Sequence, residues 1–139
     1  MNTGIQPAMF YIYDDIPLFW DAWDCMDYHL ETRRLPDFVN EIGPEVLAAG
    51  PIVGCYKWSA GFGNGSSVTR YTIMRADSGM IEYYTVVDWK ETHKFLKVEF
   101  PVDVLSREAT YEIQYGHLTR PTHQNTSWDM AKFEVCGHK

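Results

Sequence analysis

Apolar and polar side chains alternate along most of this chain. In Leu96–Phe100, the Leu, Val and Phe side chains fall on one face of an extended backbone, and Lys and Glu fall on the other. Ser67–Arg75 alternates in the same way, and Met80–Asp88 is rich in β-branched and aromatic residues. Further strands are expected at Phe10–Tyr13, Thr110–Tyr115 and Ala131–Val135. A period of two in so many segments predicts an all-β, antiparallel fold.

The connections between these segments are typical of hairpins. Gly61–Ser66 contains Asn64-Gly65, a strong hairpin signal, and Asp77–Gly79 supports a second tight turn. Leu35–Gly54 is interrupted by several Pro and Gly residues, so it is expected to be a loop with one weak strand at Glu45–Ala49. Long antiparallel strands with short turns favour a β-sandwich or a large meander.

One segment departs from the period of two. Trp20, Trp23 and Met26 recur every three residues, which predicts a short helical turn near residues 17–26 with Pro17 close to its start. His29–Arg34 is expected to follow as a strand.

Composition narrows the class of protein. The chain has 139 residues, which suits one domain, and its net charge of -7 with scattered Lys and Arg argues against a nucleic-acid partner. No apolar stretch approaches the ~18 residues of a membrane span. The residues before Pro7 do not resemble a signal peptide. The three Cys match no disulfide or metal spacing, so reduced thiols and a cytoplasmic location are expected.

Ten residues, Arg120–Asp129, are unusually dense in hydrogen-bonding groups. An Arg can bind a carboxylate through two N–H groups, a His titrates near neutral pH, and a Trp offers an N–H and a flat apolar face. The candidate site residues are Arg120, His123, Asn125, Trp128 and Asp129. The alternative interpretation is a structural crossover whose polar side chains satisfy buried backbone groups.

A second candidate is the acidic and aromatic stretch that contains Trp20, Asp21, Trp23 and Asp24. Carboxylates beside aromatic faces suit sugar binding, and two carboxylates flanking a bond are the groups that hydrolyse glycosides. The alternative is that the Asp residues cap turns while the Trp residues fill the core. Glu91 and His93 could both be metal ligands, but no third ligand lies near them in the sequence, and no metal site is expected in the chain.

Several blocks of the sequence, taken in order, resemble one known family. They are Ile12–Pro17, Trp20–Asp24, His93–Pro101, Tyr111–Leu118, Arg120–Asp129 and Phe133–Val135. Together they resemble the C-terminal β region of glycoside hydrolase family 38 α-mannosidases, most closely the cytosolic type. The resemblance covers nearly the whole chain and is weakest over residues 35–65.

The resemblance implies a fold and a division of labour. Residues 10–139 would be a truncated piece of an antiparallel β-sandwich, of the galactose-mutarotase-like supersandwich type, and residues 1–9 a start that departs from the family. Members release α-linked mannose from oligosaccharides with retention of configuration. Their catalytic aspartate and divalent metal, zinc or in some cytosolic members cobalt, lie in a separate barrel domain. No catalytic residue and no cofactor is therefore expected in this chain.

What remains for this chain is a supporting role. Arg120, His123, Asn125, Trp128 and Asp129 would then wall a substrate cleft or face the catalytic domain. The expected partners are that domain, and a mannose-containing oligosaccharide in the intact enzyme. An open sheet edge would also allow self-association. The alternative function is a free-standing carbohydrate-binding or structural β module.

Overall fold

The computed structural model describes residues 9–20 and 26–132. The chain divides into two compact units, Met9–Glu99 and a second whose described part is residues 100–132. Within the described residues, no helix is long and apolar enough to cross a membrane.

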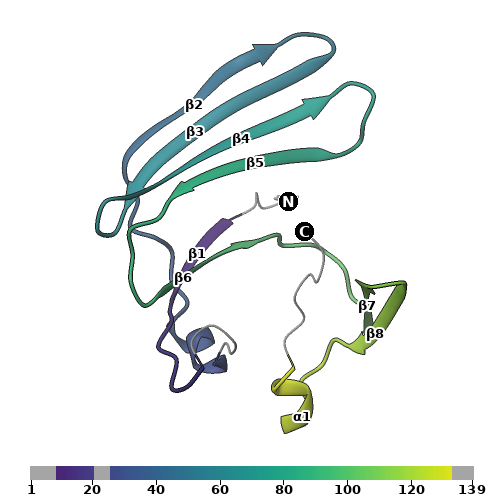
Figure 1. Cartoon of the computed structure of the whole chain (residues 1–139). Coiled ribbons are helices and arrows are strands. Elements are labelled where there is room, and N and C mark those ends of the chain that lie inside the picture. Colours follow the sequence, from purple (N-terminus) through teal and green to yellow (C-terminus); the bar gives the residue numbers. More distant parts are fainter. Residues whose placement is uncertain (1–8, 21–25, 133–139) are drawn as a thin grey trace, which may run out of the picture. The chain divides into compact units, whose positions relative to one another are not determined.

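A four-stranded antiparallel sheet forms most of the first unit (Figure 1). Its strands follow one another as β2 (Val39–Ala49), β3 (Val53–Phe62), β4 (Ser66–Arg75) and β5 (Ile81–Asp88). The β3–β4 hairpin pairs without a break from Val53 opposite Arg75 to Phe62 opposite Ser66. Gly63 and Gly65 turn this hairpin at positive φ of 55° and 98°, a conformation that favours glycine. The two predicted turns and the strands at β4 and β5 are confirmed.

A second layer packs against one face of this sheet. Strands β1 (Met9–Asp14) and β6 (Lys94–Glu99) pair antiparallel and lie beside the larger sheet in Figure 1. Phe10 of β1 stacks on Trp58 of β3, with ring centroids 6.2 Å apart. The residues of this core are Phe10, Ile12, Phe62 and Val68, with Phe38, Trp58 and Leu96 packed around them. Two antiparallel layers around an apolar core confirm the predicted all-β class.

The connection from β5 to β6 carries a buried carboxylate. Glu91 accepts hydrogen bonds from the backbone N–H of Asn64 at 2.6 Å, the Asn64 side-chain amide at 2.9 Å and the Ser66 hydroxyl at 2.7 Å. The Ser66 hydroxyl oxygen in turn accepts from the Lys90 N–H. These bonds fasten the crossing between the layers to the β3–β4 turn.

The prediction of a helical turn near residues 17–26 was only partly right. Pro17–Trp20 is not helical, and Trp20 has φ of 59°, which a right-handed helix does not allow. Residues 21–25 lie outside the described part of the chain. A short 3-10 helix, η1, begins later, at Asp27–Thr32. The strand predicted at His29–Arg34 was therefore wrong, and only Arg34 makes an isolated bridge, to Ile12.

The weak strand predicted at Glu45–Ala49 is confirmed, but the loop predicted over the rest of Leu35–Gly54 was wrong for Val39–Pro44 and for Val53 and Gly54. Most of Leu35–Gly54 is β2, and residues from Val53 onward belong to β3. The edge strand accommodates its Gly and Pro residues through irregular pairing: the Gly43–Pro44 peptide bond is cis, and the register shifts three times against β3.

The second unit contains a hairpin and one helical turn. Strands β7 (Glu108–Ile113) and β8 (Gly116–Pro121) pair from Glu108 opposite Pro121 to Ile113 opposite Gly116. The single turn α1 (Ser127–Met130) follows. The strand expected at Thr110–Tyr115 is largely β7. Of the strand expected at Ala131–Val135, Ala131 caps α1 instead, and residues 133–135 lie outside the described part.

Candidate interdomain site

The polar run at Arg120–Asp129 begins in a strand and ends in a helix. Arg120 belongs to β8, where it pairs with Ala109 and is half-buried. His123 and Asn125 lie in the connection that follows, and Trp128 and Asp129 belong to α1. The run is thus a strand-to-helix connection rather than the strand-to-strand connection that the sequence suggested.

Thr126 and Asp129 make two hydrogen bonds with each other at the N-terminus of α1. The Asp129 N–H donates to the Thr126 hydroxyl oxygen at 3.2 Å, and the Thr126 hydroxyl donates to the Asp129 carboxylate at 2.8 Å. This is a capping box, in which the N-cap residue and the residue three positions later satisfy each other. The hydrogen bond from Thr126 holds the pKa of Asp129 below its usual range, and the nearby His123 and Lys132 act in the same direction.

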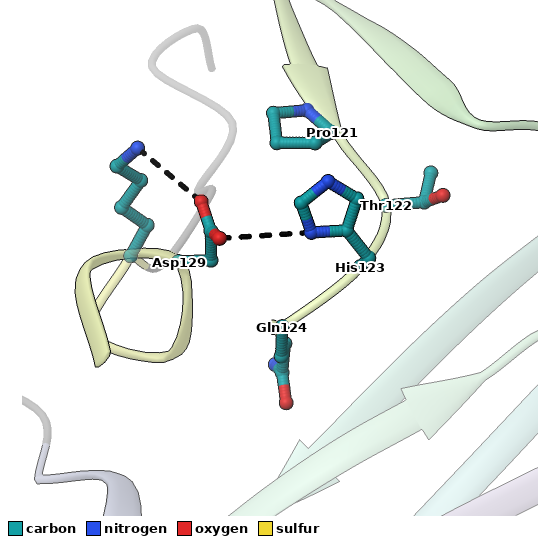
Figure 2. A pocket seen from close by; sticks show the side chains of 6 residues that line it. Pro121, Thr122, His123, Gln124 and Asp129 are labelled. Carbon is teal, nitrogen blue, oxygen red and sulfur yellow. Dashed lines mark ion pairs between the residues drawn. The ribbon is translucent and has the colours of Figure 1, made fainter. Parts of the chain in front are cut away.

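Asp129 is also the centre of a small charged cluster. Its carboxylate lies 3.6 Å from His123 Nδ1 and 3.9 Å from Lys132 Nζ (Figure 2). The Asp129 side chain is only 13% exposed, whereas His123 is half exposed. A hollow of about 80 Å³ lies between them, lined by Pro121, Thr122, His123, Gln124, Asp129 and Lys132. It is a small polar recess in which a His faces a carboxylate.

A larger and shallower hollow adjoins the same segment. It has a volume of about 460 Å³ and shares Pro121, Thr122 and His123 with the smaller one. Thr122 holds this shared wall in place, because its hydroxyl donates to Ser106 O at 2.6 Å and its N–H donates to Arg107 O at 3.1 Å. Thr122 therefore uses its polar groups to tie the run to the backbone of the segment before β7.

The structure gathers only some of the five candidates. His123 and Asp129 line the same hollow, but Arg120, Asn125 and Trp128 do not. Trp128 is 80% exposed, so its ring is presented to the surroundings rather than used in the core of this unit. The run can therefore offer a flat apolar ring and an imidazole held near a carboxylate.

The acidic and aromatic stretch is less well defined. Trp20 is exposed, while Asp21, Trp23 and Asp24 lie outside the described residues. Upstream, Asp14 is taken up by ion pairs with Lys94 Nζ at 2.6 Å and Arg34 Nη2 at 2.9 Å. The hydrogen bonds from these two cations lower the pKa of Asp14. Asp14 therefore remains ionised and serves the packing of β1.

Metal ligation finds no support in the part of the chain that the structure describes. No three His, Cys, Asp or Glu side chains of residues 9–20 and 26–132 are grouped so that they could hold a metal ion. Glu91, one of the two potential ligands in the sequence, directs its carboxylate to Asn64 and Ser66 instead.

Two arrangements were missed by sequence reasoning. The Thr126–Asp129 capping box has a readable signal, a Thr followed three residues later by an acidic residue. The ion pair of Arg33 with Glu99 joins residues 66 positions apart and has no local signal.

The chain is similar to known proteins over nearly its whole length. The family described as Glycosyl hydrolases family 38 C-terminal domain matches residues 3–139. Alpha-mannosidase 2C1 of Homo sapiens is 48% identical over 98% of this chain, Alpha-mannosidase G of Dictyostelium discoideum is 42% identical over 92%, and Alpha-mannosidase of Saccharomyces cerevisiae is 40% identical over 94%. The chain spans only 12–13% of the length of these relatives. The chain therefore belongs to the family of glycosyl hydrolase family 38 C-terminal domains.

Proposed function

We propose that this chain is a non-catalytic β-domain of a retaining α-mannosidase that hydrolyses terminal α-linked mannose from oligosaccharides. In this role it supports a catalytic domain that lies outside it and that holds the divalent metal, and the enzyme acts in the cytoplasm. The observation that carries the proposal is the 40–48% identity to proteins named alpha-mannosidases over nearly the whole chain.

The pKa shifts of three described carboxylates agree with a supporting role. A general acid works best when its pKa lies near the working pH. The hydrogen bonds to Asp14, Glu91 and Asp129 lower the pKa of each of them instead. Each accepts hydrogen bonds from neighbouring donors within its own unit, so none of the three is suited to act as a general acid.

The Arg120–Asp129 run is the part proposed to face the rest of the enzyme. Trp128 exposes a large flat ring, and exposed aromatic and Arg side chains are the groups that most often anchor interfaces. The capping box and the Thr122 bonds fix the backbone beneath these side chains, so the surface is held in shape before a partner arrives.

A chimera tests this function. The matching segment of the Homo sapiens relative is replaced by this chain, and mannoside hydrolysis is compared for the chimera, the unaltered relative and the chain alone. The chimera is expected to hydrolyse the mannoside in a metal-dependent way, and the chain alone is expected not to. Robust hydrolysis by the chain alone, or a folded chimera without activity, would contradict the proposal.

Two substitutions in the chimera test the surface. Arg120→Ala and Trp128→Ala are each expected to lower kcat/KM or the melting temperature, by roughly tenfold or by several degrees. Tyr115→Ala is the matched control, since Tyr115 is a fully exposed aromatic at the β7–β8 turn. If both variants have the same kinetics and melting temperature as the control, the Arg120–Asp129 run does not form the interface.

A second candidate function is sugar binding by the chain alone. The observation that favours it is Trp20, which is 74% exposed beside the acidic stretch. Titration with manno-oligosaccharides is expected to give saturable quenching of Trp fluorescence if the chain binds sugar, and Trp20→Ala is then expected to remove the response. Unchanged fluorescence throughout would exclude this function.

A further inference from the structure

The β3–β4 turn contains an Asn-Gly pair. Of the four Asn residues in the sequence, Asn2, Asn40, Asn64 and Asn125, only Asn64 is followed by Gly. In such a pair the Gly nitrogen can attack the side-chain carbonyl carbon of the Asn, because Gly has no Cβ to hinder the approach. Asn64 and Gly65 are both exposed, so water can reach the pair. The turn therefore presents the groups that deamidation requires.

Deamidation converts the Asn side chain into a carboxylate and consumes only water. The Gly65 nitrogen forms a bond to Asn64 Cγ, the Cγ–Nδ2 bond breaks, and the proton of the Gly65 nitrogen leaves with Nδ2 as ammonia. Water then opens the resulting cyclic imide at one of its two carbonyl carbons. The product at position 64 is aspartate or isoaspartate, and isoaspartate also adds one carbon to the backbone.

Glu91 restrains the Asn64 side chain. Asn64 Nδ2 donates to Glu91 Oε2 at 2.9 Å, and the Asn64 backbone N–H donates to Oε1 at 2.6 Å. A carboxylate only accepts hydrogen bonds, so the nitrogen of the Asn64 amide must face Glu91. Cyclisation moves Cγ onto the Gly65 nitrogen and expels Nδ2, and both changes work against these two bonds.

Glu91 is in turn held by groups around it. Its side chain is nearly buried, and the Ser66 hydroxyl donates to Oε1 at 2.7 Å. The Lys90 N–H donates to Ser66 Oγ at 2.9 Å, so the backbone of the crossing from β5 to β6 belongs to the same network. A local opening of this crossing withdraws Glu91 and releases the Asn64 amide.

We propose that Asn64 is a deamidation site that Glu91 protects, so that the chain is modified there when the crossing from β5 to β6 opens. The new carboxylate would lie where the Asn64 amide donated to Glu91, and two like charges at that distance repel each other. Isoaspartate would also lengthen the turn Gly63–Gly65, whose ends are fixed by the pairing of Phe62 with Ser66. Modification therefore weakens the bonds that fasten the crossing.

The first test follows deamidation at neutral pH in the full 139-residue chain, by peptide mass spectrometry. Folded Asn64 is expected to react at least roughly tenfold more slowly than Asn64 of the chain unfolded in urea, the factor that one hydrogen bond to a charged group provides. Glu91→Gln is expected to raise the folded rate by a similar factor, because an amide cannot accept at both of its ends.

Glu82→Gln is the matched control for this variant. It neutralises a carboxylate of β5 that pairs with Arg75 at 2.8 Å, and it is expected to leave the Asn64 rate unchanged. Circular dichroism melts check that both variants fold. If Glu91→Gln does not fold, the unaltered chain answers the same question in urea concentrations below its unfolding transition, where the Asn64 rate is expected to rise as local opening increases.

The second test measures the effect of the product. Asn64→Asp is expected to lower the melting temperature at pH 7 by several degrees and to speed hydrogen exchange at the Lys90 amide. Asn40→Asp makes the same change at an exposed position of β2 and is expected to alter neither measurement.

Three results would overturn the proposal. They are equal Asn64 rates in the folded and unfolded chain, a folded rate that does not change with urea, and a rate in folded Glu91→Gln no higher than in Glu82→Gln. An Asn64→Asp chain as stable as Asn40→Asp would show that modification does not weaken the crossing. None of these measurements uses mannosidase activity, so the proposal stands or fails separately from the proposed function.

Discussion

Arg33 holds the carboxylate of Glu99 at two points, through Nε to Oε1 at 2.9 Å and Nη2 to Oε2 at 2.7 Å. The Tyr13 hydroxyl donates a third hydrogen bond to Glu99 at 2.6 Å. The guanidinium beside it lowers the pKa of Glu99 from 4.5 to about 2, and burial with the Glu99 hydrogen bond raises the pKa of Tyr13 to about 12. These three residues link the C-terminal end of η1 to β1 and to the end of β6.

The depressed pKa of Glu99 predicts an acid-sensitive stability. Below pH 4.5 the unfolded chain takes up a proton at this carboxyl while the folded chain resists it, so stability is lost as the pH falls from about 4.5 toward about 2. Glu99→Gln is expected to lower the melting temperature at pH 7 by a few degrees and to flatten this acid limb. Urea unfolding at several pH values measures both. An unchanged acid limb in the variant would show that other carboxylates cause it.

Gly63 predicts a strong effect of one added methyl group. A Cβ at Gly63 would collide with the Glu91 carboxylate, and the residue has φ of 55°. Gly63→Ala is therefore expected to lower the melting temperature by roughly 5–10 °C. Gly79→Ala is the control, because a Cβ there meets nothing within 4 Å. Equal melting temperatures for the two variants would mean that Glu91 moves aside without loss.

The capping box predicts the effect of losing one hydroxyl. Thr126→Ala removes both bonds between Thr126 and Asp129, and loss of an N-cap side chain costs about 1 kcal/mol. The amide of Met130, which donates to Thr126 O, is then expected to exchange faster with solvent. Thr126→Ser keeps the hydroxyl and is expected to keep the protection. Identical exchange in the Ala and Ser variants would show that the box does not hold α1.

The small core predicts a high cost for its aromatic members. Phe62 is buried at the end of β3 and packs against Phe38 and Trp89. Phe62→Ala leaves a cavity and is expected to lower the free energy of unfolding by about 3–5 kcal/mol. Ile52→Ala, at an exposed position, is the control and is expected to change it little. Denaturant unfolding of both variants measures the difference.

Regular strands could be predicted from the sequence, and irregular ones could not. β4 and β5 pair without register shifts, and both are rich in β-branched and aromatic residues, which favour strands. β2 contains Gly43 and Pro44, which usually mark a loop, and its bulges disturb the period of two. β3 was missed because Gly54, Gly61 and the small Ser59 and Ala60 give no clear alternation, although its pairing with β4 is complete.

The candidate site was predictable in content but not in geometry. The density of polar groups at Arg120–Asp129 drew attention to the segment, yet of its five candidate residues only His123 and Asp129 line the same hollow. Their proximity depends on the turn of α1, which brings Asp129 back toward the connection. The sequence did not predict a helix at Ser127–Met130, so it could not predict that His123 and Asp129 lie close together.

The three hydrogen bonds of Glu91 also make the β3–β4 turn depend on a segment that follows much later in the chain. The β3–β4 hairpin is local and its turn needs only neighbouring residues to close, but two donors of Asn64 and the Ser66 hydroxyl await a carboxylate some 27 positions further on. That carboxylate arrives only when the chain has left β5 and begun the crossing to β6. The final hydrogen bonds of the turn therefore need the crossing to β6 to be in place, and a probe at Asn64 is expected to report the assembly of the whole unit rather than of its own hairpin.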